Sequence, residues 1–144
     1  MQFEGEHLLP GNIGQFFVLL AFVASIISTI AYLKAAKKTD LVQKRSWLNF
    51  ARVAFTTQLI SAIIIFVLIF YICANHYFEY MYAYKHASKE LEPKYLLACI
   101  WEGQEGSFLL WVIWHSILGV FIMFKSKEWE APVMTVISLA QFFL

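Results

Sequence analysis

Long uncharged apolar runs dominate the pattern of hydrophobic and polar positions along the chain. Three of them cover residues 13–33, 53–73 and 108–124, and a fourth covers residues 131–144. About 20 helical residues rise ~30 Å, which is the thickness of the hydrocarbon core of a bilayer. Since backbone groups inside a membrane must be hydrogen-bonded within their own segment, these runs predict helices. The expected fold class is all-α: a polytopic helical membrane protein with three full transmembrane helices and a truncated fourth.

The first and last runs bear on the expected domain organisation. The fourth run stops after 14 residues while it is still apolar, which is too short to cross a bilayer. We therefore expect residues 1–144 to be the amino-terminal transmembrane region of a longer protein. The first run is expected to stay in place as a span and not to be cleaved as a signal peptide. Its amino-terminal flank carries Glu4 and Glu6 and no lysine or arginine.

The composition agrees with a membrane protein and excludes other classes. The chain is 60% hydrophobic and only 15% charged, whereas soluble domains are nearer ~45–50% apolar and ~25% charged. So few charged residues could hardly cover the surface of a soluble enzyme. The net charge of +1 provides no basic field, so nucleic acid is not expected as a partner. The lipid bilayer is the first expected partner.

The basic residues are unevenly distributed among the connections between the runs. The connection between the first two runs, with its flanks, holds six of the eleven lysines and arginines, and the connection after the third run holds Lys125 and Lys127. The loop over residues 74–107 holds three lysines and five acids. The positive-inside rule places the two basic connections in the cytoplasm. It therefore predicts that the amino terminus and the 74–107 loop face outward.

Polar and small residues inside the first two runs indicate helix packing. In the first run, small residues recur at spacings of three and four: Ala21, Ser25 and Ser28. They share one helical face, where another helix can approach closely. Gln58 in the second run is expected to make an interhelical hydrogen bond. Cys73 and Cys99 bracket the outward loop, and their sequence spacing leaves a disulfide between them open.

Ring-bearing side chains recur at every second position in the first half of the outward loop, from His76 to His86. A period of two predicts an extended segment with these rings on one face. Two interpretations stay open: an interfacial aromatic belt, or a wall for a flat apolar ligand such as a porphyrin, with both histidines as axial ligands.

In the third run, His115 lies near Trp111 and Trp114. It is either a further haem ligand or a hydrogen-bonded packing residue.

The most specific motif lies where the outward loop enters the third run. Residues 101–111 have the sequence Trp-Glu-Gly-Gln-Glu-Gly-Ser-Phe-Leu-Leu-Trp. Ser107 is expected to cap the helix, and Glu105 is expected to lie near its positive dipole end. Gly103 and Gly106 permit a tight re-entry of the backbone.

This segment resembles the Trp-x-x-x-Glu-Gly-Ser-x-Leu-Leu-Trp motif of the CcmF/NrfE-type cytochrome c haem lyases. The motif residues in this chain are Trp101, Gly103, Glu105, Gly106, Ser107, Leu109, Leu110 and Trp111. Residues 84–95 resemble the Tyr…Ser…Leu-Pro…Tyr stretch of that family, with Glu92 as a departure between leucine and proline. Residues 11–16 resemble its outward-facing amino terminus.

The resemblance implies a function in cytochrome c-type biogenesis. It implies a haem lyase of the bacterial inner membrane that handles haem and attaches it to apocytochrome c on the periplasmic side. Haem is then the expected cofactor, and a haem chaperone, apocytochrome c and the remainder of the lyase are the expected partners. The Trp-rich haem-handling segment of the family does not occur in these 144 residues. We therefore assign no catalytic residue, and the alternative is a non-catalytic helical scaffold subunit of a respiratory or assembly complex.

Overall fold

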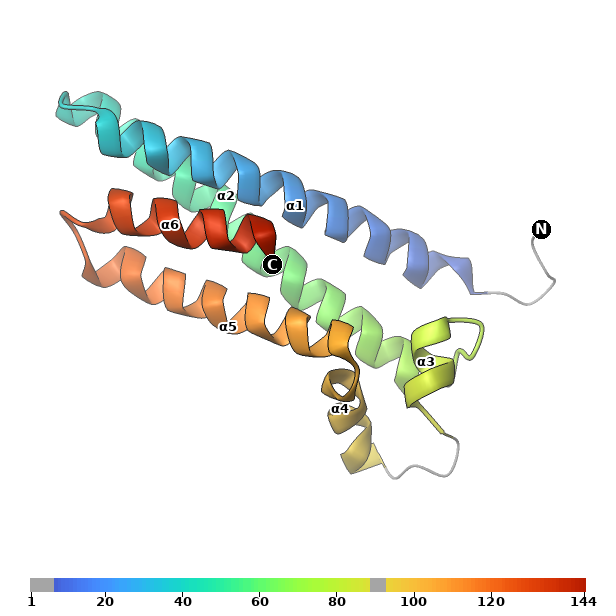
Figure 1. The fold of residues 1–144 in the computed structure, drawn as a ribbon. Helices are drawn as coiled ribbons and strands as arrows, with labels where there is room; N and C mark the ends of the chain where they lie inside the picture. Colours follow the sequence, from blue (N-terminus) through green and yellow to red (C-terminus); the bar gives the residue numbers. More distant parts are fainter. Residues whose placement is uncertain (1–6, 89–92) are drawn as a thin grey trace.

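The computed structural model describes residues 7–88 and 93–144, and every regular element in these residues is a helix. Four long helices lie side by side (Figure 1): α1 (Leu8–Lys37), α2 (Leu41–Ala74), α5 (Gln104–Lys125) and α6 (Glu130–Phe143). The short helices α3 (Met81–His86) and α4 (Pro93–Glu102) lie at one end of this bundle. The all-α prediction is confirmed.

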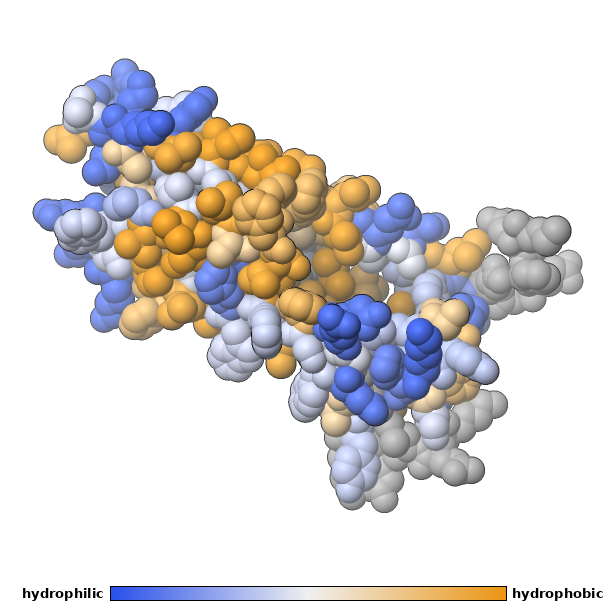
Figure 2. All heavy atoms as spheres, in the orientation of Figure 1, coloured by the Kyte–Doolittle hydropathy of each residue, from blue (hydrophilic) through white to orange (hydrophobic). Residues whose placement is uncertain are grey.

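Three of the helices, α1, α2 and α5, are long and apolar enough to cross a membrane. Helix α6 has 14 residues, so the fourth apolar run forms a shorter helix, as expected. Figure 2 shows an apolar surface over the middle of the bundle, with hydrophilic residues gathered towards its two ends. The chain is therefore a polytopic helical membrane protein. The helices α1 and α2 are longer than the apolar runs because each continues into polar residues beyond them.

The two ends of the bundle differ in charge. The α1–α2 and α5–α6 turns lie at the same end (Figure 1), which we call the basic end. Its basic residues are Lys34, Lys37, Lys38, Lys44, Arg45, Arg52, Lys125 and Lys127. The opposite end, which we call the loop end, holds the start of α1 together with α3 and α4. The start of α1 and the described residues of the 74–107 loop thus share one end, as the predicted topology requires.

Small side chains allow α1 to approach its neighbours closely. On the predicted face of α1, Ser25 and Ser28 are buried and Ala21 is half-buried, with Ala24 and Ala31 buried beside them. The Ser28 hydroxyl lies 3.0 Å from the Ser138 hydroxyl of α6. The predicted packing face is therefore confirmed. Towards the basic end, the buried rings of Tyr32 and Phe55 form the centre of the core.

Candidate functional site

The motif segment forms the corner between α4 and α5 at the loop end. Helix α4 ends at Glu102, Gly103 is the extended residue before the next helix, and α5 begins at Gln104. The predicted cap at Ser107 is wrong, because α5 starts one turn earlier. The Ser107 hydroxyl instead donates to the carbonyl oxygen of Trp101 at 2.9 Å, in the last turn of α4. Glu105 lies in the first turn of α5, as predicted.

Gly106 allows α4 and α5 to touch at this corner. A Cβ on Gly106 would lie 1.5 Å from the carbonyl oxygen of Ile100 and 2.6 Å from the Tyr82 hydroxyl. Only glycine fits there, so the predicted tight re-entry of the backbone is confirmed. The Tyr82 hydroxyl also donates to the Ile100 carbonyl, which ties α3 to the same point of the corner.

His86 lies against the motif. A Cβ on Gly103 would be 3.0 Å from His86 Nε2 and 3.3 Å from Glu105 Oε2, which limits the separation of these two atoms to about 6.3 Å. The His86 ring also packs against the Tyr82 ring, with centroids 4.7 Å apart. The structure thus brings one of the predicted haem-binding histidines against Gly103 of the motif and within about 6.3 Å of Glu105.

The segment from His76 to His86 is not extended, so that prediction is wrong. The chain leaves α2 through a left-handed residue, His76, with φ 54°. The N–H of His76 bonds to the Cys73 carbonyl and that of Tyr77 to the Ile72 carbonyl, a Schellman turn. Turns follow, and residues 81–86 form α3, where side chains four apart share a face and alternate ones do not. The period of two therefore does not place the six rings on one face.

The first of the predicted histidines, His76, has an unsatisfied ring nitrogen. Its Nε2 is buried and has no hydrogen-bond partner among the described residues. The ring lies at a tilt to that of Phe78, with centroids 5.7 Å apart. Buried polar groups normally have a partner, so this nitrogen is a candidate to bind a ligand or metal.

His115 lies within α5 and takes part in a polar network between helices. Its Nδ1 is 3.1 Å from the side-chain nitrogen of Gln141, which also donates to the Ser116 hydroxyl at 3.0 Å. The side-chain nitrogen of Gln58 donates to the Gln141 side-chain oxygen at 2.8 Å. The predicted interhelical hydrogen bond of Gln58 is confirmed. His115 makes the packing contact that was one of its two interpretations, while Trp111 and Trp114 lie exposed on the surface of α5.

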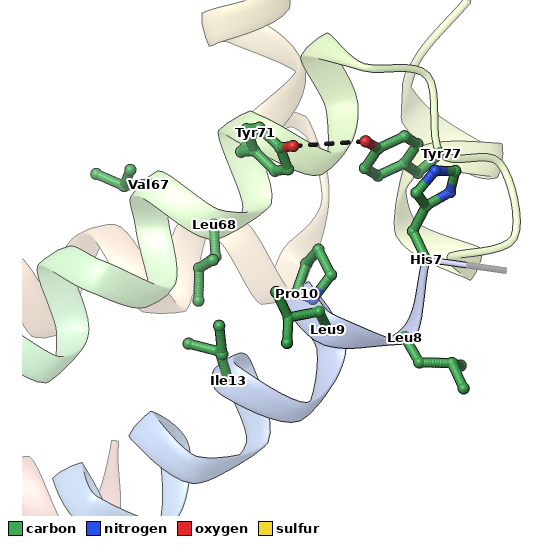
Figure 3. Close-up of a pocket in the computed structure, with 9 residues that line it drawn as sticks. All are labelled: His7, Leu8, Leu9, Pro10, Ile13, Val67, Leu68, Tyr71 and Tyr77. Carbon is green, nitrogen blue, oxygen red and sulfur yellow. Dashed lines mark hydrogen bonds between the residues drawn. The ribbon is translucent and has the colours of Figure 1, made fainter.

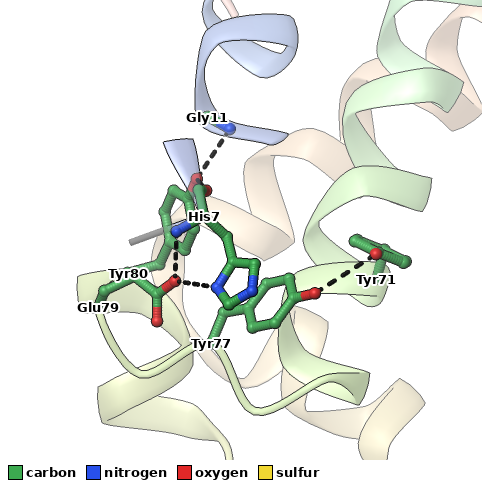
Figure 4. Close-up of polar contacts among 6 residues, drawn as sticks. All are labelled: His7, Gly11, Tyr71, Tyr77, Glu79 and Tyr80. Atoms are coloured by element: carbon green, nitrogen blue, oxygen red, sulfur yellow. Dashed lines mark hydrogen bonds and ion pairs between the residues drawn. The ribbon is translucent and has the colours of Figure 1, made fainter. Parts of the chain in front are cut away.

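A further group of contacts, for which the sequence pattern contains no signal, holds the start of α1 to the loop (Figure 4). The His7 ring stacks on Tyr77 with centroids 4.1 Å apart. The backbone N–H of His7 donates to Glu79 Oε1 at 3.1 Å, and His7 Nδ1 lies 3.0 Å from the same oxygen. The Tyr80 hydroxyl accepts from the Gly11 N–H at 2.9 Å and donates to the His7 carbonyl. We call these five residues the clasp. They join positions about 70 apart in sequence.

Two titrating groups of the clasp have shifted pKa values. Hydrogen bonds from the backbone N–H groups of Glu79 itself and of His7, together with the His7 ring, lower the pKa of the Glu79 carboxyl. The Tyr77 hydroxyl lies 3.4 Å from that of Tyr71, and this hydrogen bond raises the pKa of Tyr77. The clasp therefore favours a charged Glu79 carboxylate, and Tyr71, which lies outside the clasp, favours a neutral Tyr77 phenol.

A cavity of about 650 Å³ lies beside the clasp, between the start of α1 and the end of α2 (Figure 3). Its wall is mostly apolar, and the polar atoms come from His7, Tyr71 and Tyr77. A concave apolar site with few polar groups suits an apolar small molecule. None of the histidines predicted to bind haem lines this cavity.

Other predicted features lie partly outside the described residues. Cys73 is buried, but the side chain of Cys99 is outside the described part, and so is Glu92. Over residues 7–88 and 93–144, no three histidine, cysteine or acidic side chains converge as they would around a metal ion. Comparison with protein-family models, curated proteins and solved structures finds no match to this chain.

Proposed function

We propose that this chain acts in cytochrome c-type biogenesis, as part of a membrane haem lyase that attaches haem to apocytochrome c. The observation that carries the proposal is the motif corner. Residues that resemble the haem lyase motif form a turn that depends on Gly106, and His86 lies against Gly103 in that turn. A sequence motif and a candidate ligand thus converge at one place.

The arrangement of the two ends supports a periplasmic site. The motif corner, the clasp, His76 and His86 all belong to the loop end, whereas eight of the eleven basic residues belong to the basic end. By the positive-inside rule, the basic end would face the cytoplasm of a bacterial inner membrane. The loop end would then face the side on which apocytochrome c and a haem chaperone are available.

The side chains at the loop end fit haem in two respects. His76 has a buried Nε2 without a partner among the described residues, and His86 Nε2 belongs to the motif corner, 3.0 Å from the place that a Cβ on Gly103 would take. A single imidazole nitrogen is a common axial ligand of haem iron. Bound haem would supply the iron and the vinyl groups to which cysteine thiols add. The role of this chain would be to hold and orient it.

Substitution of Glu105 tests the proposal. We expect the Glu105→Gln substitution to lower the amount of covalently bound haem in c-type cytochromes when the full-length variant replaces the wild-type protein in cells. Glu105 is exposed, so the substitution should leave the amount of protein in the membrane unchanged. Haem staining of electrophoresed membranes measures the product, and immunoblotting measures the protein. A matched control is Glu128→Gln, which removes an exposed acid at the other end of the bundle.

Undiminished haem staining in Glu105→Gln would contradict the proposal and favour the non-catalytic scaffold.

The histidines are tested separately by the haem absorption spectrum of the purified full-length protein. We expect His86→Ala or His76→Ala to change the spectrum, and an unchanged spectrum in both would exclude them as ligands. The third variant is His115→Ala. We expect it to leave the spectrum unchanged, because the Nδ1 of His115 is already hydrogen-bonded to Gln141.

A further inference from the structure

A second cavity, of about 470 Å³, lies at the basic end between α2, α5 and α6. Its charged residues are Arg52, Lys127 and Glu130. Its apolar wall includes Leu48, Val120 and Phe124. The cavity therefore combines cations with a hydrophobic surface, which is the combination that an anionic amphiphile requires.

Arg52 is held rigidly in this cavity by Glu130. Its Nε donates to one carboxylate oxygen of Glu130 at 2.7 Å and its Nη2 donates to the other at 2.5 Å. The Glu130 side chain is 1% exposed, whereas that of Arg52 is 44% exposed. A guanidinium has five N–H donors in a fixed plane, so this bidentate pair leaves donors for a second anion. Glu130 thus positions Arg52 and does not consume all of its binding capacity.

The charge balance of the cavity favours an anion. Arg52 and Lys127 carry two positive charges against the single negative charge of Glu130. Lys125 and Glu128 are exposed residues of the same region and do not line the cavity. The basic end as a whole holds eight lysines and arginines and three acids. An anion in the cavity would meet Lys127 directly and the remaining donors of Arg52.

The position of the cavity along the bundle indicates which anion. Arg52 immediately precedes the apolar run 53–73, and Lys127 follows the apolar run 108–124 by three residues. Both therefore lie at the boundary between the hydrocarbon core and water, which is where the phosphates of phospholipids lie. Phe124 is 80% exposed beside them. A soluble phosphate would leave this ring uncovered, whereas an acyl chain would cover it.

We propose that this cavity binds an anionic phospholipid. Its phosphate contacts Lys127 and the outer edge of Arg52, and an acyl chain lies along Leu48, Val120 and Phe124. Basic pockets between transmembrane helices at the cytoplasmic side bind anionic head groups by this combination of contacts. The lipid site is independent of the proposed function, since it lies at the opposite end of the bundle from the motif corner.

The test compares two neighbouring lysines. The full-length protein is reconstituted in bilayers of phosphatidylcholine with phosphatidylglycerol, and native mass spectrometry then counts the lipids that stay bound. We expect wild-type protein to retain phosphatidylglycerol in preference to phosphatidylcholine. Lys127→Gln should weaken this retention about fivefold, the loss of one lysine–head-group contact. Lys125→Gln should behave like the wild type, because Lys125 does not line the cavity.

Several results would overturn the proposal. Equal losses in Lys127→Gln and Lys125→Gln would mean that the lipid is attracted by the basic surface in general. Equal retention of the two lipids would mean that charge does not select the ligand. Displacement of phosphatidylglycerol by inorganic phosphate would make a soluble anion the occupant. Both lysines are exposed, so unchanged thermal unfolding of the variants shows that misfolding is not the cause.

Discussion

Replacement of Gly106 by alanine would insert one methyl group at the contact between α4 and α5. The new Cβ would lie 1.5 Å from the carbonyl oxygen of Ile100, 2.6 Å from its carbonyl carbon and 2.6 Å from the Tyr82 hydroxyl. Ordinary van der Waals contact begins at 3.4 Å, so the Ile100 carbonyl would have to move by about 2 Å. Because this carbonyl belongs to the backbone of α4, it cannot move alone, and α4 would shift as a unit.

The expected cost follows from these contacts. Overpacking of a tight site costs ~1–3 kcal/mol, and loss of the hydrogen bond from Tyr82 to Ile100 costs ~1 kcal/mol. The better helix propensity of alanine returns ~0.5–1 kcal/mol. We therefore expect Gly106→Ala to lower the free energy of unfolding by about 2 kcal/mol, with the loss concentrated in α4 and the first turn of α5.

Hydrogen–deuterium exchange of the full-length protein in detergent measures this effect locally, and thermal unfolding measures it globally. The matched control is Gly14→Ala in α1, where the new Cβ would have only one neighbour, Leu68 Cδ1 at 4.0 Å. We expect the control to be neutral or slightly stabilising. Unchanged exchange in α4 of Gly106→Ala, with unfolding like that of the control, would refute the reasoning.

Three further predictions concern contacts outside the motif. Arg52→Met should destabilise the protein by ~3 kcal/mol in thermal unfolding, because it leaves buried Glu130 unpaired, and Arg52→Met/Glu130→Leu should recover most of this loss. Failure of the double variant to recover stability would contradict this account. Gln141→Leu should cost ~1–2 kcal/mol, since it removes the amide that bonds to α2 and α5, and a loss no larger than that of exposed Gln43→Leu would contradict it. The wild-type protein should be more stable than Glu79→Gln, because the folded state lowers the pKa of the Glu79 carboxyl. This difference should be fully present above the ordinary pKa of a glutamate, 4.5, and should disappear as the pH falls through the lowered pKa of Glu79. Unfolding midpoints of both proteins between about pH 3 and 7 measure this difference, and a difference that grows in acid would refute it.

The clasp and the pair of Arg52 with Glu130 illustrate what a linear pattern does not contain. Glu130 is one of two acids, with Glu128, at the edge of an apolar run, and such residues usually face water. The structure buries it because α6 turns back and places it against α2, 78 residues earlier in the chain. His7 likewise finds Glu79 only because α2 returns the chain to the end at which α1 begins.

The two wrong predictions have a common cause. The extended ring segment and the Ser107 cap were both inferred from local spacing. At His76 a left-handed turn reverses the chain, and at Gly103 the extended backbone ends one helix and starts the next. The ring segment is wrong in element type, since residues 81–86 are helical, and the Ser107 cap is wrong in position, since α5 begins one turn earlier. Boundaries of helices depend on how the flanking segments dock, which a short sequence window does not describe.

The sequence alone determined that this chain is helical, that it spans a membrane and that both turns with basic residues lie at one end. These properties follow from hydrophobicity and charge summed over some 20 residues, and bilayer thickness and the absence of water impose them on any such run. Only the tertiary structure decided which groups meet: His86 with Gly103, Gly106 with Ile100, Gln58 with Gln141, and Arg52 with Glu130. Those contacts depend on the rotation and depth at which the helices pack. A change of one residue in helix register would turn the contacting side chains by about 100°, so short-range spacing cannot specify them.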